Sequence, residues 1–164
     1  MEKEKNFLLW LVAPHSKISR EVTEKDIEKV VEEANILYNL CFTPNGIING
    51  ALAMAHPQID DNDPLRFFVT AKRELIINPK IIRATNTTID SKEGCASFPN
   101  EKPIIVQRHN KIEIEFITLI VDPDNKDKFK FSSVLNDNLS GKQAKIFSHE
   151  IDHLNGVYIY NINN

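Results

Sequence analysis

The segment FSHEIDHLNG, residues 147–156, constrains the fold of this chain more than any other. It places His149 and His153 four residues apart, with Glu150 directly after the first histidine. On an α-helix, residues i and i+4 lie on one face, so the two imidazoles would point at a common location. Histidine is a mediocre helix former and adds nothing to amphipathicity, so incidental histidines on an exposed helix explain the segment poorly. H-E-x-x-H on a helix instead offers two ligands to a zinc-like ion, with a glutamate placed to accept a proton.

The residues around this segment favour a helix with one buried side. Ser140 and Gln143 are spaced as a capping box at its start, and Asn155-Gly156 is a typical C-terminal stop. The apolar stripe, offset from the histidines, comprises Phe147, Ile151 and Leu154. We therefore expect a helix that begins after Ser140, buries one side in the core and turns its histidines toward a cleft.

The composition is that of an ordinary globular protein. The chain has 164 residues, 41% of them hydrophobic and 26% charged, so we expect residues 1–164 to form a single domain with one core. A net charge of -3 gives no electrostatic reason to expect nucleic-acid binding. The apolar run 7–13 is too short to cross a membrane, and no signal-peptide pattern surrounds it. Two cysteines do not make a disulfide scaffold, so we expect a cytoplasmic protein without membrane or direct DNA contact.

An amphipathic helix is expected within residues 23–42. Thr23 can cap it, with Asp26 three residues on. An apolar stripe follows at helical spacing and comprises Ile27, Val30, Val31, Ala34, Leu37, Tyr38 and Cys41. Cys41 belongs to this stripe, so we interpret it as a small core residue.

The middle of the chain has strand-like patterns. Residues 65–71 and 74–78 are short apolar runs joined by a charged turn. Residues 111–116, KIEIEF, alternate strictly between charged and apolar side chains, which is typical of a half-buried antiparallel strand. Residues 128–131 alternate similarly, and the final VYIY at 157–160 has strand composition. The expected fold class is α+β, with mainly antiparallel strands around a C-terminal helix that carries the metal ligands.

Two histidines do not complete a tetrahedral site, so a third ligand must come from elsewhere in the chain. The candidates are the many carboxylates and Cys95, His15, His56 and His109. Gly94 precedes Cys95 and would let the backbone approach a ligand closely. Taken alone, Cys95 still fits a buried structural cysteine better than a ligand.

Two segments together resemble the second and third motifs of the peptide deformylases, enzymes that remove the N-formyl group from nascent polypeptides. The family patterns are E-G-C-x-S and Q-H-E-x-D-H-L-x-G. The matching residues are Glu93, Gly94, Cys95 and Ser97, followed by His149, Glu150, Asp152, His153, Leu154 and Gly156. Further similarity lies in IINPKII and VQRHNKIEIE, and the resemblance extends over about residues 9–160. It implies a deformylase-like fold for the chain.

The first motif of that family, G-x-G-x-A-A-x-Q, is altered in this chain. It aligns with ALAMAHPQ at residues 51–58, where Ala55 and Gln58 match. The replacements are Ala51 and Ala53 for the two glycines, His56 for the second alanine and, before the first metal-binding histidine, Ser148 for glutamine. We expect the Ala53 methyl to narrow the cleft, and restoring the family residues at positions 53 and 56 to reopen it. The His56 imidazole must point elsewhere or repack a neighbour, and we expect a hydrogen-bonded core histidine.

The resemblance also implies roles for individual residues. Cys95, His149 and His153 would hold one divalent metal ion, Fe(2+) by resemblance, with Zn(2+), Ni(2+) or Co(2+) as alternatives. Glu150 would move the proton of the attacking water to the leaving amine. The Gln58 side-chain amide and the Ala96 backbone N–H would stabilise the oxyanion.

Other residues would support this site. By resemblance, Leu52, Ala53 and Gly94 would contact the substrate. Asp152 could fix the tautomer of a histidine or be an exposed charge. Opposite charges in two matched segments suggest that Arg108 pairs with Glu93 and holds the Cys95 loop.

The function implied is removal of the formyl group from formyl-methionyl peptides of newly made proteins. The partners would be an N-formylated peptide or a nascent chain, with association with the ribosome, and the protein would be a monomer. One alternative is a homologue that keeps the metal but acts on another N-acyl substrate or is inactive. A general H-E-x-x-H endopeptidase would leave the EGCAS segment unexplained. A metal-stabilised binding module would have no need of Glu150.

Overall fold

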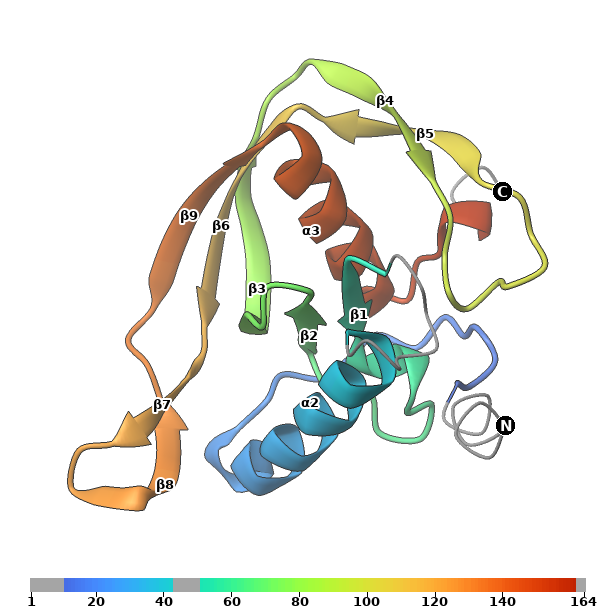
Figure 1. The fold of residues 1–164 in the computed structure, drawn as a ribbon. Coiled ribbons are helices and arrows are strands. Elements are labelled where there is room, and N and C mark those ends of the chain that lie inside the picture. Colours follow the sequence, from blue (N-terminus) through green and yellow to red (C-terminus); the bar gives the residue numbers. More distant parts are fainter. Residues whose placement is uncertain (1–10, 43–50, 162–164) are drawn as a thin grey trace.

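The computed structural model describes residues 11–42 and 51–161. These residues form a five-stranded antiparallel sheet of order β1-β2-β3-β6-β9, two two-stranded ribbons and two α-helices (Figure 1). The strands are β1 (Ala53–Ala55), β2 (Phe67–Thr70), β3 (Leu75–Ala84), β4 (Thr88–Glu93), β5 (Ile104–His109), β6 (Lys111–Ile117), β7 (Leu119–Asp122), β8 (Asn125–Phe131) and β9 (Leu135–Ser140). The helices are α2 (Ile27–Cys41) and α3 (Gly141–Leu154), and 3₁₀ turns occupy Glu24–Asp26, His56–Gln58 and Ile159–Asn161. The predicted α+β class with mainly antiparallel strands is confirmed.

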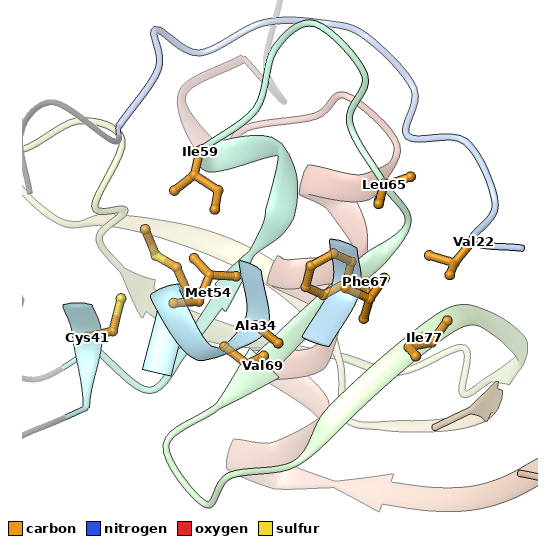
Figure 2. Packing of buried hydrophobic residues seen from close by; sticks show 11 residues of the cluster. Val22, Ala34, Cys41, Met54, Ile59, Leu65, Phe67, Val69 and Ile77 are labelled. Carbon is orange, nitrogen blue, oxygen red and sulfur yellow. The ribbon is translucent and has the colours of Figure 1, made fainter. Parts of the chain in front are cut away.

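Helix α2 starts at the predicted position and buries the predicted stripe. The Thr23 N–H donates to Asp26 Oδ2 at 2.8 Å, and a 3₁₀ turn leads from there into the helix. The buried members of the stripe are Val30, Ala34, Leu37 and Cys41. They pack with Met54, Phe67 and Val69 in one apolar cluster (Figure 2). Cys41 is therefore a core residue, as predicted.

Strand β2 lies between the two helices, and its four residues are all buried. Because successive side chains point to opposite faces, Phe67 and Val69 join the α2 cluster while Phe68 joins the α3 cluster. The Phe68 ring meets Phe147 of α3 edge to face, with 5.1 Å between ring centroids. The predicted apolar stripe of α3 thus packs in the core, and the side of the helix that carries His149 and His153 does not contribute to this apolar cluster.

Strand β6 has the half-buried character that its sequence predicts. Ile112 and Ile114 are buried, and the strand pairs with β3 on one side and β9 on the other. The β7–β8 ribbon follows β6 and extends away from the helices (Figure 1).

Two local predictions are wrong. VYIY at 157–160 is not a strand, because Tyr158 and Ile159 are both buried and their alternation is lost in a 3₁₀ turn. Gly156 directs this reversal with φ of +73°, and a Cβ there would collide with the Ser16 carbonyl oxygen. Ser140 is the N-cap residue of α3, but its side chain makes no capping hydrogen bond, so the predicted capping box does not form.

Candidate active site

The structure brings Cys95, His149 and His153 together, although 54 residues separate the cysteine from the first histidine in the sequence. One ligand atom from each lies within 4.8 Å of the other two. Cys95 Sγ is 3.5 Å from His153 Nε2, and the two Nε2 atoms are 3.0 Å apart. Cys95 comes from the loop after β4, and the histidines come from one face of α3.

The chemistry of these three groups fits a bound cation. Burial alone would lower the pKa of His149, but hydrogen bonds to Cys95 and Glu93 raise it to about 10. Burial and the neighbouring His149 lower the pKa of His153 well below its usual value. The thiol and carboxylate groups that raise the pKa of His149 also favour a positive charge at this position, which a bound metal ion can supply in place of the ring proton. A thiolate and two imidazoles are also a donor set used by zinc and by other first-row metals.

Glu93 fixes the orientation of His149. The His149 Nδ1–H donates to Glu93 Oε1 at 2.8 Å, so Nε2 is the ring nitrogen that faces Cys95 and His153 and that would ligate a metal ion. Burial would raise the pKa of Glu93, but the hydrogen bonds from Arg108 and His149 lower it to about 2, so the carboxylate is ionised.

Arg108 joins two acidic residues beside the site. Its guanidinium donates to Glu93 at 2.8 and 2.9 Å and to Asp152 Oδ2 at 2.5 Å. The pairing of Arg108 with Glu93 therefore exists, whereas its effect on the Cys95 loop stays a prediction. The proposed contact of Asp152 with a histidine is wrong, because its carboxylate faces Arg108 and Glu93 is the acceptor for His149.

Glu150 lies in the pocket wall with a buried carboxyl group. The residue is 4% exposed, and its Oε2 has no hydrogen-bond partner among the described residues. Burial is the main reason that its pKa rises to about 7. A carboxyl group with this pKa can both accept and return a proton near neutral pH.

Gln58 is buried in the 3₁₀ turn after β1, and its side-chain amide has a fixed orientation. Oε1 accepts from the Ala55 N–H at 2.9 Å, so Nε2 is the end that faces Cys95 and Ser97. Nε2 lies 3.1 Å from Ser97 Oγ and 3.9 Å from Cys95 Sγ. The turn thus places an N–H donor next to the candidate metal ligands.

A pocket of about 460 Å³ opens over these groups. Its walls are the β1 segment 51–54, the end of β4 with the loop 91–96, and the first turns of α3. The residues predicted to touch substrate, Leu52, Ala53 and Gly94, all line it, as do Ala96 and the second altered position, Ala51. Among the described residues β1 pairs only with β2, so its other edge has no strand partner there and has the hydrogen-bonding groups to pair with an extended peptide.

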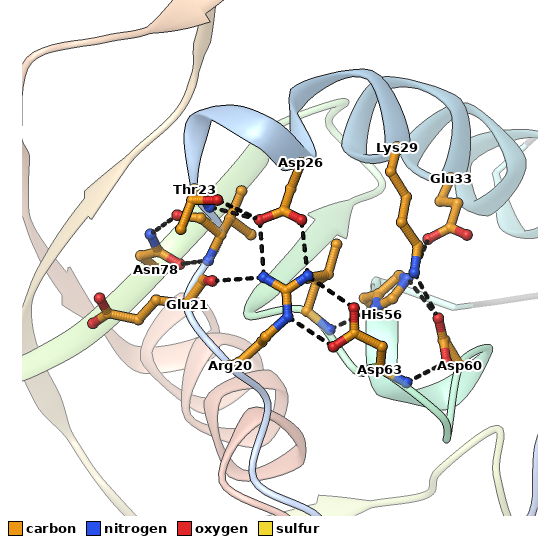
Figure 3. Close-up of polar contacts among 12 residues, drawn as sticks. Arg20, Glu21, Thr23, Asp26, Lys29, Glu33, His56, Asp60, Asp63 and Asn78 are labelled. Carbon is orange, nitrogen blue, oxygen red and sulfur yellow. Dashed lines mark hydrogen bonds and ion pairs between the residues drawn. The ribbon is translucent and has the colours of Figure 1, made fainter.

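His56 points away from this pocket and into a second polar cluster beneath α2 (Figure 3). The ring is fully buried, stacks on Phe67 and accepts the Leu65 N–H at Nδ1 over 2.9 Å. Nε2 must then carry the ring proton, which it donates to Glu33. This is the hydrogen-bonded core histidine expected from the sequence. The expectation that replacing His56 would reopen the cleft is wrong, because the side chain does not line it.

The second cluster contains residue types that ligate metals, but its protonation and its ion pair do not suit a bound cation. Atoms of Glu33, His56 and Asp60 also lie within 4.8 Å of one another. The Lys29 ammonium is already 2.9 Å from Asp60 Oδ2, and the only His56 nitrogen near the carboxylates is the protonated one. No sequence pattern indicates this cluster, because Glu33 is one of several charged residues on the polar side of α2.

The remaining histidines lie outside the candidate metal group. His15 Nε2 is 3.0 Å from the Pro57 carbonyl oxygen, and His109 Nδ1 is 2.6 Å from that of Thr85. No helix within residues 11–42 and 51–161 is long and apolar enough to span a membrane.

Comparison with known proteins agrees with the fold. The sequence profile of the family described as polypeptide deformylase matches residues 11–164. A peptide deformylase of Thermotoga neapolitana is 32% identical over 111 residues, covering 66% of this chain and 59% of that protein. One of Thermotoga petrophila is 30% identical over 139 residues, covering 83% of this chain and 69% of that protein. The chain thus spans less than two thirds of the first of these relatives.

Solved structures give the same result. The crystal structure of peptide deformylase from Thermotoga maritima superposes with a TM-score of 0.61 at 27% identity, over 88% of this chain and 87% of that one. PDF from a Vibrio parahaemolyticus bacteriophage, in complex with actinonin, superposes with a TM-score of 0.66 at 26% identity, over 90% and 95% of the two chains. The chain belongs to the peptide deformylase family. That family is metal-dependent, and Cys95, His149 and His153 are a group able to hold a metal ion.

Proposed function

We propose that this protein is a metal-dependent hydrolase that removes the formyl group from formyl-methionyl peptides of newly made proteins. Membership of the deformylase family supports the reaction class. The observation that carries the proposal is that Glu150 and Gln58 line the same pocket as Cys95 and His149, with His153 one turn further along α3. A proton carrier, an N–H donor and a set of metal ligands at one place are what amide hydrolysis requires.

Cys95, His149 and His153 would hold the metal ion, with Glu93 orienting His149. When bound, a divalent ion supplies Lewis acidity that makes a water molecule a better nucleophile. We propose Fe(2+) on the basis of the family, with Zn(2+), Ni(2+) or Co(2+) as alternatives that the same ligands accept.

Glu150 would act as the proton carrier. Its carboxylate accepts a proton as the water oxygen attacks the formyl carbon, and the acid then gives that proton to the amine as the C–N bond breaks. Formate and a free N-terminus are the products. The pKa of about 7 for Glu150 suits both halves of this transfer.

Gln58 and Ala96 would stabilise the oxygen of the former formyl carbonyl. The Gln58 amide is held with Nε2 toward the site by the Ala55 N–H, so it needs no rearrangement to donate. The Ala96 N–H would be the second donor. Leu52, Ala53 and Gly94 would line the path of the peptide, whose backbone can pair with the open edge of β1.

A direct assay tests this function. The protein, loaded in turn with Fe(II), Ni(II) and Zn(II), is incubated with a formyl-Met dipeptide, an acetylated peptide and an unmodified protein substrate. We expect formate and a free amine from the first substrate only. Release of acetate would favour another N-acyl substrate, and internal cleavage of the protein would favour an endopeptidase.

One observation favours the N-acyl alternative as a second candidate. Ala51 and Ala53 place methyl groups in the pocket wall at positions where the family motif has glycine. A narrower wall beside the site changes which acyl group fits. We also propose that the chain acts as a single-domain monomer in the cytoplasm and meets its substrate at the ribosome.

A further inference from the structure

Three lysines line the candidate active-site pocket. Lys92 is exposed at the end of β4, and Lys142 is exposed in the first turn of α3. Lys145, one turn further along α3, is half-buried, and its Nζ donates to the Asp90 carbonyl oxygen at 2.8 Å. This hydrogen bond holds an ammonium group against the side of the pocket where β4 lies.

No free carboxylate balances these charges. The carboxyl groups in the pocket lining are Glu93, which is engaged by Arg108 and His149, and the buried Glu150. Among the described residues, neither Lys92 nor Lys142 has an ion-pair partner, and the first turn of α3 contains no acidic residue. The pocket wall therefore carries uncompensated positive charge next to the place where a peptide would lie.

Helix stability does not explain the two lysines on α3. A cation in the first turn of a helix is unfavourable, because it meets the positive end of the helix dipole. Neither lysine has an acidic residue three or four positions away on the helix. Lys142 is thus placed at some cost in helix stability, Lys145 gains no ion pair along the helix, and both lysines line the pocket.

The helix geometry relates these charges to the reacting bond. Along α3, Lys145 and Lys142 precede His149 by four and seven residues, which is about 6 and 10 Å of helix at about 1.5 Å per residue. A peptide extended along α3 would advance about 3.3 Å per residue, so these distances would correspond to about two and three residues of substrate.

We propose that the pocket selects N-formylated peptides that carry an acidic side chain within the first three residues after the formyl group. This inference rests on the proposed function and specifies its substrate class. The lysines attract the carboxylate of the substrate, and Lys145 is already held in place to do so. Since an exposed ion pair changes affinity by up to about fivefold, the two α3 lysines together should give about a threefold to tenfold preference, which weakens as salt is added.

The test uses three formyl-Met peptides that differ at the second and third positions, which carry glutamates, glutamines or lysines. Affinity is measured by fluorescence anisotropy on the metal-loaded Glu150→Ala variant, and kcat/KM is measured on the wild type. We expect the glutamate peptide to bind about threefold to tenfold more tightly than the glutamine peptide, and the lysine peptide to bind least tightly. Equal affinities for the three peptides at low salt would overturn the proposal.

Variants of the lysines locate the effect. Lys142→Gln should reduce the preference for glutamate, and Lys142→Glu should shift it toward the lysine peptide. Lys142 is exposed, so neither change threatens folding, whereas Lys145→Gln also removes the bond to Asp90. The matched control is Lys128→Gln, an exposed lysine of β8 outside the pocket lining, which should leave the preference unchanged.

The two proposals can fail separately. Hydrolysis of all three peptides with equal affinities would leave deformylation standing and refute the acidic preference. Preferential binding of the glutamate peptide without any hydrolysis would refute deformylation and support the acidic preference. An undiminished preference in Lys142→Glu would show that Lys142 does not contribute to it and would overturn the assignment.

Discussion

Two clusters of this protein join a histidine to a glutamate, but the histidines donate through different ring nitrogens. At the candidate metal site, His149 Nδ1 donates to Glu93, and Nε2 is left facing Cys95 and His153. Beneath α2, His56 Nδ1 accepts from the Leu65 N–H, and Nε2 donates to Glu33 (Figure 3). Residue types alone do not separate the two clusters, since each offers three possible ligand atoms within 4.8 Å. The partner of the second ring nitrogen decides which histidine can bind an ion.

The largest expected effect follows from removing the proton carrier at the first cluster. Glu150→Ala should lower kcat by about a thousandfold, within the usual range for a general acid–base group. Metal content should stay near that of the wild type, because Glu150 is not among the grouped ligands. Formate release and elemental analysis measure the two quantities. A variant that loses its metal, or keeps full turnover, would show that Glu150 has another role.

Gln58→Leu should have the next largest effect. Loss of one oxyanion donor costs on the order of a hundredfold in kcat. Because Gln58 Oε1 also accepts the Ala55 N–H, a thermal melt must accompany the kinetics. Gln58→Glu is the matched control: it keeps that acceptor but replaces the N–H donor with a carboxylate oxygen. Normal kcat in either variant would exclude Gln58 from the oxyanion site.

Replacing the glutamate of each cluster by glutamine tests the comparison between the two clusters directly. Glu93→Gln should weaken metal affinity by about tenfold to a hundredfold, as expected for the residue that orients a ligand. Glu33→Gln makes the same chemical change beneath α2 and should leave metal affinity unchanged. Competition with a metal chelator measures both. Equal loss of affinity in the two variants would mean that the clusters do not differ in the way that their hydrogen bonds indicate.

His56→Ala should destabilise the fold without removing the metal. The change leaves the Leu65 N–H and Glu33 without their partner and opens a cavity beside Phe67, at a cost of about 2–4 kcal/mol in the free energy of unfolding. Urea denaturation of the metal-free protein measures this free energy. If His56→Ala instead releases the metal, the second cluster takes part in binding it.

The change that should widen the cleft is Ala53→Gly, because Ala53 lies in the pocket wall.

Sequence periodicity was sufficient for the parts of the site that lie on one helix. Because residues four apart on an α-helix lie on the same face, the spacing of His149 and His153 predicts that their side chains lie together. Cys95 could not be assigned from its own neighbours, since its contact with the histidines spans 54 residues, and only the family resemblance identified it. From the sequence, Asp152 is either a partner for a histidine or an exposed charge, because the sequence does not show that Arg108 of β5 lies beside it.

Other features depend on tertiary packing that a local pattern does not contain. His56 and Glu33 meet because the turn after β1 packs under α2, and neither segment indicates the other. VYIY has strand composition, yet Gly156 turns the chain and both Tyr158 and Ile159 are buried. The two lysines on α3 could be read from the sequence as exposed charges, and only the pocket shows that they share a wall with the site.

Anomalous scattering at the absorption edge of the bound metal tests the central claim most directly. Crystals grown with the metal that the protein retains on purification should show one peak, bonded to Cys95 Sγ and to the Nε2 atoms of His149 and His153. The cluster of Glu33, His56 and Asp60 should show none, because its histidine presents a protonated nitrogen and Lys29 occupies the space. A peak at that second cluster, or a carboxylate in place of Cys95 at the first, would contradict the account.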